Sequence, residues 1–107
     1  MATSSAQSGG VYGPPPMTIT SFVRHTVADY ATWREHYDAF QKTDEASVIK
    51  AETVFQGTED PNDVTVIHEF DSITEAQALL GSQQLQEAMV AAGVQGEPEI
   101  WFTEKAG

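Results

Sequence analysis

The sequence predicts an α+β domain in which helices cover one face of an antiparallel sheet. Two kinds of pattern and the chain length indicate this. Four segments are rich in β-branched residues or alternate between apolar and polar residues, as half-buried strands do. Segments between them place apolar residues at three- and four-residue steps, as amphipathic helices do. The length, 107 residues, fits a single domain.

Residues 1–16 carry no charged side chain and consist mostly of Ser, Gly, Pro, Ala and Thr. Such a segment buries too little apolar surface to offset the entropy cost of ordering, so we expect a disordered tail. The folded domain is then residues 17–107. Its first strand is predicted at residues 17–27, with His25 on one face and Arg24 on the other.

Aromatic residues mark one side of the helix that follows. Asp29 supplies the side-chain oxygen that caps a helix N-terminus. The aromatic residues then recur at three- and four-residue steps over about four turns: Tyr30, Trp33, Tyr37 and Phe40.

Two strands joined by a turn are predicted next, at residues 47–56 and 63–71. The residues between them, GTEDPND, favour tight turns. In the second of these strands, His68 shares a face with Val66 and Phe70.

Two short helices and a last strand complete the domain. Ser72 and Glu75 have the spacing of a capping box, in which each side chain bonds to the backbone N–H of the other residue. Ser82 starts a second helix, which Gly93 ends. The last strand is predicted at residues 98–104.

The predicted order, β-α-β-β-α-α-β, is compact as the split βαβ, ferredoxin-like fold. In this fold one face of the sheet has no helices. Large apolar side chains would be exposed on that face: Phe22, Ile67 and either Trp101 or Phe102. We therefore expect a homodimer whose two sheets pack face to face. Arg24 and Glu69 also belong to this face, where a diagonal ion pair is expected.

Composition excludes several partners and chemistries. Lys and Arg number 5 against 16 Asp and Glu, a net charge of −11, so neither nucleic acid nor an anionic membrane surface is an expected partner. The absence of cysteine excludes a thiolate nucleophile and Cys-ligated metal sites. We expect a cytoplasmic protein.

Three stretches of the sequence resemble a known family. They are VRHTVADYATWREHYDAF at residues 23–40, DPNDVTVIHEFDS at 60–72 and LQEAMVAAGVQGEP at 85–98. They resemble small dimeric α/β-barrel proteins that are related to antibiotic-biosynthesis monooxygenases and often described as cyclase-like. The resemblance covers residues 17–104.

This resemblance implies a homodimer of ferredoxin-like subunits, each with a pocket for a hydrophobic or aromatic ligand between sheet and helices. The family includes cofactor-free oxygenases of aromatic substrates, polyketide cyclases, lactone isomerases, haem-degrading enzymes and proteins without known activity. Their catalytic residues do not carry over. Phe70 stands where oxygenase-like members often have Trp, and Leu79 and Leu85 stand roughly where a plant cyclase has Tyr and His.

Two histidines are the first candidates for chemistry. His25 lies four residues before Asp29, and His68 lies four residues before Ser72. In the split βαβ fold we expect the first and third strands to be parallel neighbours, about 4.8 Å apart, which would bring the two imidazoles close together. Such a pair lowers at least one pKa and keeps a neutral base for proton abstraction beside a carbonyl, with Tyr37 donating to the developing enolate. The alternative is that one histidine is a hydrogen-bonded core or rim residue and the other lines an inert pocket.

We expect the ligand to contact five further residues: Trp33, Val23, Val66, Phe70 and Leu79. No cofactor is expected. A metal ion would need Glu52, Glu69 or His36 beside the histidine pair, and it is disfavoured because no His-x-His or His-Glu-x-x-His spacing occurs.

The sequence leaves three kinds of function open. The first is a cofactor-free enzyme that carries out cyclase- or isomerase-like acid and base chemistry on a hydrophobic carbonyl compound. The second is a cofactor-free monooxygenase of aromatic substrates. The third is a dimer without catalytic activity that binds a ligand, takes part in a stress response or serves as a structural module.

Overall fold

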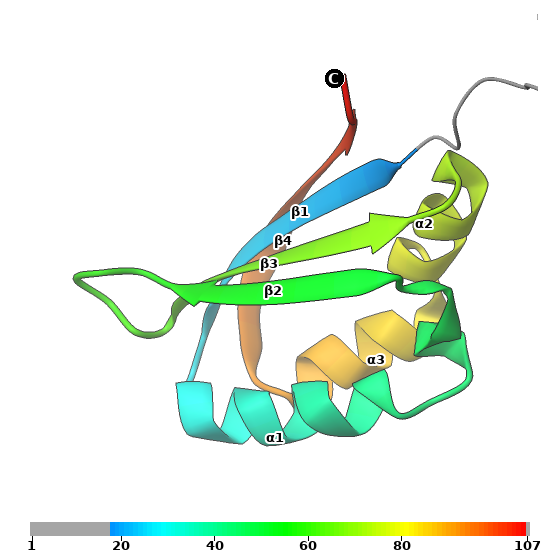
Figure 1. Cartoon of the computed structure of the whole chain (residues 1–107). Coiled ribbons are helices and arrows are strands. Elements are labelled where there is room, and N and C mark those ends of the chain that lie inside the picture. Colours follow the sequence, from blue (N-terminus) through cyan, green and yellow to red (C-terminus); the bar gives the residue numbers. More distant parts are fainter. Residues whose placement is uncertain (1–17, 107) are drawn as a thin grey trace, which may run out of the picture.

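The computed structural model describes residues 18–106, and the tail predicted at residues 1–16 lies outside the described residues. The elements follow in the order β1 (Ile19–Val27), α1 (Tyr30–Gln41), the short 3-10 helix η1 (Glu45–Val48), β2 (Ala51–Gln56), β3 (Asp63–Phe70), α2 (Ile73–Leu80), α3 (Gln83–Ala91) and β4 (Val94–Glu104). The strands form one antiparallel sheet in the order β2-β3-β1-β4. Helices α1 and α3 lie on one side of it (Figure 1). The predicted ferredoxin-like fold is therefore confirmed.

Strand pairing corrects one expectation on which the histidine pair depended. Strands β1 and β3 are neighbours, as predicted, but they run antiparallel. The reason is topological: β1 and β2 run in the same direction with β3 between them, and a tight turn reverses the chain from β2 to β3. Two residues that lie at the same distance from the C-terminal ends of β1 and β3 are therefore at opposite ends of the sheet.

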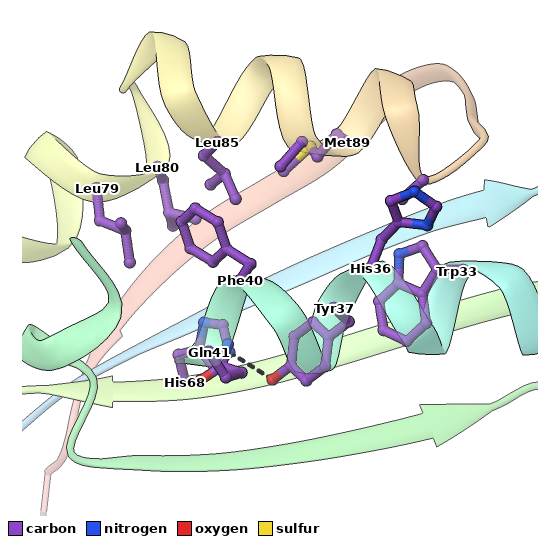
Figure 2. Close-up of a pocket in the computed structure, with 12 residues that line it drawn as sticks. Trp33, His36, Tyr37, Phe40, Gln41, His68, Leu79, Leu80, Leu85 and Met89 are labelled. Carbon is purple, nitrogen blue, oxygen red and sulfur yellow. Dashed lines mark hydrogen bonds between the residues drawn. The ribbon is translucent and has the colours of Figure 1, made fainter. Parts of the chain in front are cut away.

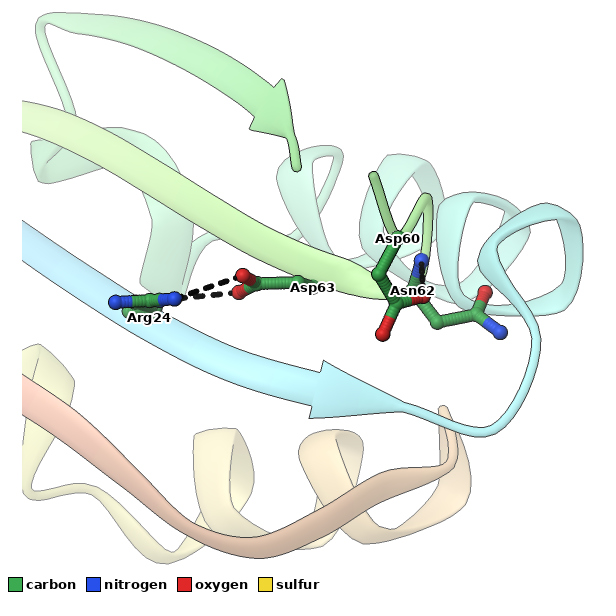
Figure 3. Close-up of polar contacts among 4 residues, drawn as sticks. All are labelled: Arg24, Asp60, Asn62 and Asp63. Atoms are coloured by element: carbon green, nitrogen blue, oxygen red, sulfur yellow. Dashed lines mark hydrogen bonds and ion pairs between the residues drawn. The ribbon is translucent and has the colours of Figure 1, made fainter. Parts of the chain in front are cut away.

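The start of α1 is held by the turn between β2 and β3. Asp29 caps the helix by accepting a hydrogen bond from the backbone N–H of Thr32 at 3.0 Å. Asn62 Oδ1 accepts a second bond from the backbone N–H of Tyr30 at 2.9 Å. Asp60 in turn accepts a bond from the Asn62 backbone N–H at 3.0 Å (Figure 3). The turn thus positions the helix that carries the aromatic side chains.

The strand predicted at residues 47–56 is wrong in its first part. Residues Glu45–Val48 form the 3-10 helix η1, and β2 begins only at Ala51. Val48 and Ile49 are adjacent in sequence, yet both pack against the cluster around Ile19 and Phe70. A strand sends adjacent side chains to opposite faces, so this packing requires a turn of helix instead.

Strand β4 is longer than the predicted 98–104 and begins at Val94. Its pairing with β1 shifts between Arg24 and Thr26, which marks a bulge. Gly96 lies in the bulge with φ at +70°, a conformation that glycine adopts without strain. The bulge lets the strand continue through a Gly- and Pro-containing stretch that looks like a loop in the sequence.

The helix caps follow the sequence closely. Ser72 and Ser82 cap α2 and α3, each accepting a backbone N–H three residues later at 3.1 Å. The second bond of the capping box differs from the prediction, because the Ser72 hydroxyl donates to the Glu75 carboxylate at 3.4 Å. Gly93 follows α3 with φ at +89°. No helix among residues 18–106 has both the length and the apolar character needed to cross a membrane.

The helix-free face carries a row of apolar side chains across three strands. Phe22 of β1 lies opposite Ile67 of β3 on one side and Trp101 of β4 on the other. The Phe22 and Trp101 rings stack with their centroids 5.3 Å apart, and Trp101 is 45% exposed. Phe102 instead packs into the core under the helices. The alternation predicted for Trp101 and Phe102 is thus confirmed.

The ion pair predicted on this face has a different partner. Arg24 forms a bidentate pair with Asp63, with distances of 3.0 Å from Nε to Oδ1 and 2.8 Å from Nη2 to Oδ2 (Figure 3). Glu69 lies opposite Thr20, which is four residues before Arg24 on β1. The antiparallel register therefore places Glu69 too far from Arg24 for the predicted contact.

Candidate active site

A small cavity lies between the sheet and helices α1 and α3. Its volume is about 50 Å³, which is room for a few water-sized groups, since one water needs about 10–15 Å³. Most of its lining is apolar: Trp33, Phe40, Leu79, Leu80, Leu85, Ala88, Met89 and Ala92. Four polar side chains complete it, His36, Tyr37, Gln41 and His68 (Figure 2). The mix of apolar walls and a few polar groups is typical of small-molecule sites, although this cavity is smaller than most of them.

A chain of hydrogen bonds links three side chains beside this cavity. The hydroxyl of Tyr37, from α1, lies 2.6 Å from Glu52 Oε1 and 2.8 Å from His68 Nε2. Glu52 and His68 face the same side of the sheet, because they are directly paired in the register of β2 and β3. Tyr37 is held over them by stacking on Trp33, with ring centroids 4.9 Å apart.

The number of protons available fixes which group donates and which accepts in each of these hydrogen bonds. The Tyr37 hydroxyl has one proton to donate, and a carboxylate accepts but does not donate. We therefore assign that proton to the short bond with Glu52. The phenol oxygen then accepts the bond from His68 Nε2–H. This tautomer leaves His68 Nδ1 as an unprotonated nitrogen with a free lone pair.

Burial keeps the histidine neutral. His68 is only 7% exposed, and burial lowers its pKa to about 4, an effect that the nearby Glu52 charge opposes only in part. Burial and the hydrogen bond to Glu52 raise the pKa of Tyr37 well above its ordinary value. At pH 7 the site therefore holds a neutral imidazole and a protonated phenol.

Three buried polar atoms around the site have no hydrogen-bond partner among residues 18–106. They are His68 Nδ1, Gln41 Nε2 and the hydroxyl of Ser21. Ser21 lies on β1 directly opposite His68, and Gln41 lines the same cavity as His68. Buried polar groups in proteins are nearly always paired, so each such atom calls for an explanation.

The predicted pairing of His25 with His68 is wrong. His25 lies opposite Val64, whereas His68 lies opposite Ser21, so the two are offset by four residues along the strands. At about 3.4 Å per residue this separates them by about 14 Å along the strands. Both face the helices and are equally buried, as predicted. His25 packs near the Trp33 ring, with centroids 5.7 Å apart, and it does not line the cavity.

The residues predicted to contact a ligand divide into two groups. Trp33 and Leu79 line the cavity, as do Tyr37 and His68. The other three are core residues beneath it and do not line it: Val23, Val66 and Phe70. The sequence pattern identified inward-facing residues correctly, but it did not separate the cavity lining from the packed core.

Glu52 and Gln41 are the polar site residues that sequence reasoning did not assign to acid and base chemistry. A signal for Glu52 exists, because by strand alternation it shares the helix-facing side of β2 with Val54, although the edge position leaves it exposed. Gln41 continues the helical row of Trp33 and Tyr37 at four-residue steps. Glu52 was weighed as a metal ligand; within residues 18–106, no group of three or more His, Cys, Asp or Glu side chains is arranged to hold a metal ion.

Comparison with solved structures supports the fold. A monooxygenase from the gene ActVA-Orf6 of Streptomyces coelicolor, in complex with the ligand Nanaomycin D, superposes with a TM-score of 0.64 and 19% identity, covering 87% of this chain and 91% of its own. SnoaB, a cofactor-independent oxygenase from Streptomyces nogalater, gives a TM-score of 0.66 at 15% identity, covering 84% of this chain and 94% of its own. The fold is that of antibiotic biosynthesis monooxygenase-like proteins.

The antibiotic biosynthesis monooxygenase-like fold extends to proteins named without an activity. A conserved protein from Methanosarcina mazei Go1 superposes with a TM-score of 0.61 and 15% identity, covering 85% of this chain and 95% of its own. No family model matches the sequence, and no curated protein matches it significantly. At these identities the comparison establishes the fold, and the chemistry has to be argued from the site.

Proposed function

We propose that this protein is a cofactor-free enzyme in which His68 acts as a general base on a small hydrophobic phenol or carbonyl compound. One observation carries the proposal. His68 is a neutral, buried imidazole whose Nδ1 has no partner among residues 18–106, in the wall of an apolar cavity. A base must be unprotonated and shielded from water, and this nitrogen is both. It must also reach the substrate, and a substrate in the cavity would contact the His68 side chain.

The hydrogen-bond chain explains how the site accepts a proton. When Nδ1 takes a proton from the substrate, His68 becomes an imidazolium. Its Nε2–H then donates to the Tyr37 oxygen, whose own proton is held by the Glu52 carboxylate. Negative charge on Glu52 thus stabilises the imidazolium through the phenol. Positioned general bases contribute about 10²–10⁴-fold in rate.

The comparisons favour oxygenation as the step that follows deprotonation of the substrate. Two proteins of this fold are named as a monooxygenase and a cofactor-independent oxygenase. A deprotonated phenol is electron-rich and donates an electron to O₂. Recombination of the two radicals forms a C–O bond, and the resulting peroxide loses water to leave a quinone. Phenol and O₂ then give quinone and water, and the base is regenerated.

Isomerisation or cyclisation uses the same base without O₂. The proton taken by His68 is returned to a different atom of the substrate, or the carbanion closes a ring by attacking a second carbonyl. The short hydrogen-bond chain favours this second function too, because a stabilised imidazolium stays in place as the acid that returns the proton.

Deuterium exchange tests the shared first step. The probe is phenylacetone in D₂O under nitrogen, and NMR follows the loss of its benzylic protons. We expect exchange faster than buffer, abolished by His68→Phe and retained by His25→Phe. Oxygen uptake with single-ring phenols then separates oxygenase from isomerase chemistry. Binding of the probes without exchange or uptake would leave a ligand-binding protein without catalysis.

A homodimer is the assembly that the helix-free face supports. Phe22, Ile67 and Trp101 form an apolar row across three strands, and the neighbouring row contains Phe55, which is 51% exposed. Packing two such faces together buries both rows. We expect sedimentation to show a dimer that Trp101→Glu dissociates. The matched control is Val90→Glu on α3, which is 77% exposed on the helix side and should leave the dimer intact.

A further inference from the structure

The amide of Gln41 is a buried donor that the acid and base chemistry above does not use. Gln41 is the last residue of α1 and lines the same cavity as His68. Its Nε2 is buried and has no hydrogen-bond partner within residues 18–106. Nothing in the packing of the domain therefore accounts for a polar side chain at this position, where an apolar residue would avoid the cost of an unpaired amide.

The helix brings this amide to the cavity that the base lines. Trp33, Tyr37 and Gln41 follow one another at four-residue steps, which align side chains along one side of a helix. Tyr37 stacks between Trp33 and His68, with ring centroids 4.9 and 6.0 Å away. Gln41 comes one turn after Tyr37 and lines the same cavity as His68, whereas the Trp33 indole lies on the far side of the Tyr37 ring from His68 (Figure 2).

Tyr37 and His36 line the cavity as well, but their hydroxyl and ring N–H protons are already engaged. The single proton of Tyr37 goes to Glu52, so the phenol has none to give to a ligand. His36 bonds through Nδ1 to the backbone oxygen of Thr32, which leaves its Nε2 as an acceptor in the neutral ring. The lining between them is apolar. A ligand oxygen in this part of the cavity therefore finds the Gln41 amide as a donor in the lining, because the Ser21 hydroxyl, which is also unpaired and lies opposite His68, does not line the cavity.

We propose that Gln41 is a positioning residue whose Nε2–H donates to a ligand carbonyl oxygen while the ligand's acidic proton faces His68 Nδ1. The proposal rests on the function proposed for His68 and adds the ligand's second polar contact. It also names the class of ligand. A ligand that makes both contacts carries one acidic hydroxyl group and one carbonyl group. The cavity holds about 50 Å³, which is less than the roughly 150 Å³ of an apolar cavity that binds benzene, so the apolar side chains of the lining have to move apart to admit such a ring.

Binding of phenol and of the three hydroxybenzaldehydes tests the proposal. Phenol offers a proton to His68 but nothing to Gln41, and one isomer of hydroxybenzaldehyde should satisfy both. Titrations followed by amide chemical shifts give the affinities. We expect the best isomer to bind about fivefold more tightly than phenol, the gain of one neutral hydrogen bond. Gln41→Leu should remove that gain and leave phenol binding within about twofold.

Two more variants guard against a folding defect. Gln41→Met keeps the length of the side chain and should behave like Gln41→Leu, with circular dichroism confirming the fold. Gln77→Leu changes an exposed glutamine on α2 that does not line the cavity, and it should keep the full gain.

The outcomes separate this proposal from the function of His68. If the gain persists in Gln41→Leu, or if no isomer binds better than phenol, Gln41 does not position the carbonyl, while deuterium exchange still reports on the base. If none of the four compounds binds at millimolar concentrations, the ligand class is wrong. If His68→Phe leaves both phenol binding and exchange unchanged, the proposed function fails as well.

Discussion

Two buried histidines on the same face of the sheet have opposite surroundings. His68 lies at one end, bonded through Nε2 to Tyr37 and lining a cavity with Nδ1 unpaired. His25 lies at the other end, and neither of its ring nitrogens has a partner among residues 18–106. Both are 7% exposed, and burial lowers the pKa of both. Burial alone therefore does not make a site.

The difference comes from the neighbouring elements. Above and beside His68, α1 contributes Tyr37 and the edge strand β2 contributes Glu52. The central strand β1, which holds His25, has instead the bulged part of β4 beside it.

On the helix side His25 packs near the Trp33 ring, which offers no acceptor for an imidazole proton. His25 also lines a wide, open hollow with Asp63 and Gln95, yet neither of its nitrogens is hydrogen-bonded to them. A histidine becomes a candidate base only where a second group orients one nitrogen and a cavity leaves the other free.

The largest expected effect separates the two histidines by activity. His68→Phe should lower the rate of base-catalysed exchange by about 10²–10⁴-fold, because it removes the proton acceptor. His25→Phe is the matched control, and it should keep the rate and the fold, since no hydrogen bond of His25 is lost. The deuterium-exchange rates of both variants, measured by NMR, test this difference. Equal losses in the two variants would contradict the distinction between them.

The next effect is on the pH dependence of stability. The folded His68 has a pKa of about 4 against an ordinary value of 6.5, so between these values the unfolded chain binds a proton that the folded chain does not. Stability should fall as the pH drops from about 6.5 to about 4, by about 3 kcal/mol from this residue. Urea unfolding of wild type and His68→Gln at several pH values measures it. An unchanged pH slope in the variant would show that His68 titrates normally.

A smaller effect is expected at the group that orients His68. Tyr37→Phe removes the bonds to Glu52 and His68 but keeps the ring stacked on Trp33. It should lower the free energy of unfolding by about 1–2 kcal/mol, because the Nε2–H of His68 loses its partner. Tyr30→Phe is the control, since it changes a tyrosine of the same helix that has no contact with His68. Exchange activity should fall less than with His68→Phe.

The smallest effect is expected on the opposite face of the sheet. In the isolated subunit the pair between Arg24 and Asp63 is well exposed on the arginine side, where water and salt screen it. At protein concentrations low enough to keep the subunit monomeric, Arg24→Met should therefore change stability less than Tyr37→Phe does, and the difference from wild type should shrink further at high salt. Thermal unfolding at low and high salt measures both. A loss larger than that of Tyr37→Phe would mean that the pair is buried in an assembly.

Much of the candidate site could be predicted from the sequence, and the prediction failed at one identifiable step. Alternation placed His25 and His68 on the buried face, and helical spacing placed Trp33 and Tyr37 above them. The wrong step was the predicted direction of β3 relative to β1. With parallel strands the two histidines would be neighbours, but the strands are antiparallel and the histidines lie far apart. Position along a strand is a local property, whereas strand direction depends on how the chain connects the strands.

What the sequence determined by itself was local: strand alternation, the caps Asp29, Ser72 and Ser82, the stop at Gly93, and through their order the ferredoxin-like fold. Only the tertiary structure decided which polar groups meet. Glu52 and His68 become partners through the register of β2 and β3, and Tyr37 and Gln41 reach the same place from α1. The periodicity of apolar residues in the sequence indicates which face of a helix or strand each side chain is on, because apolar residues recur on the buried face. Contacts between elements depend on register and on the packing of helices over the sheet, which no local pattern records.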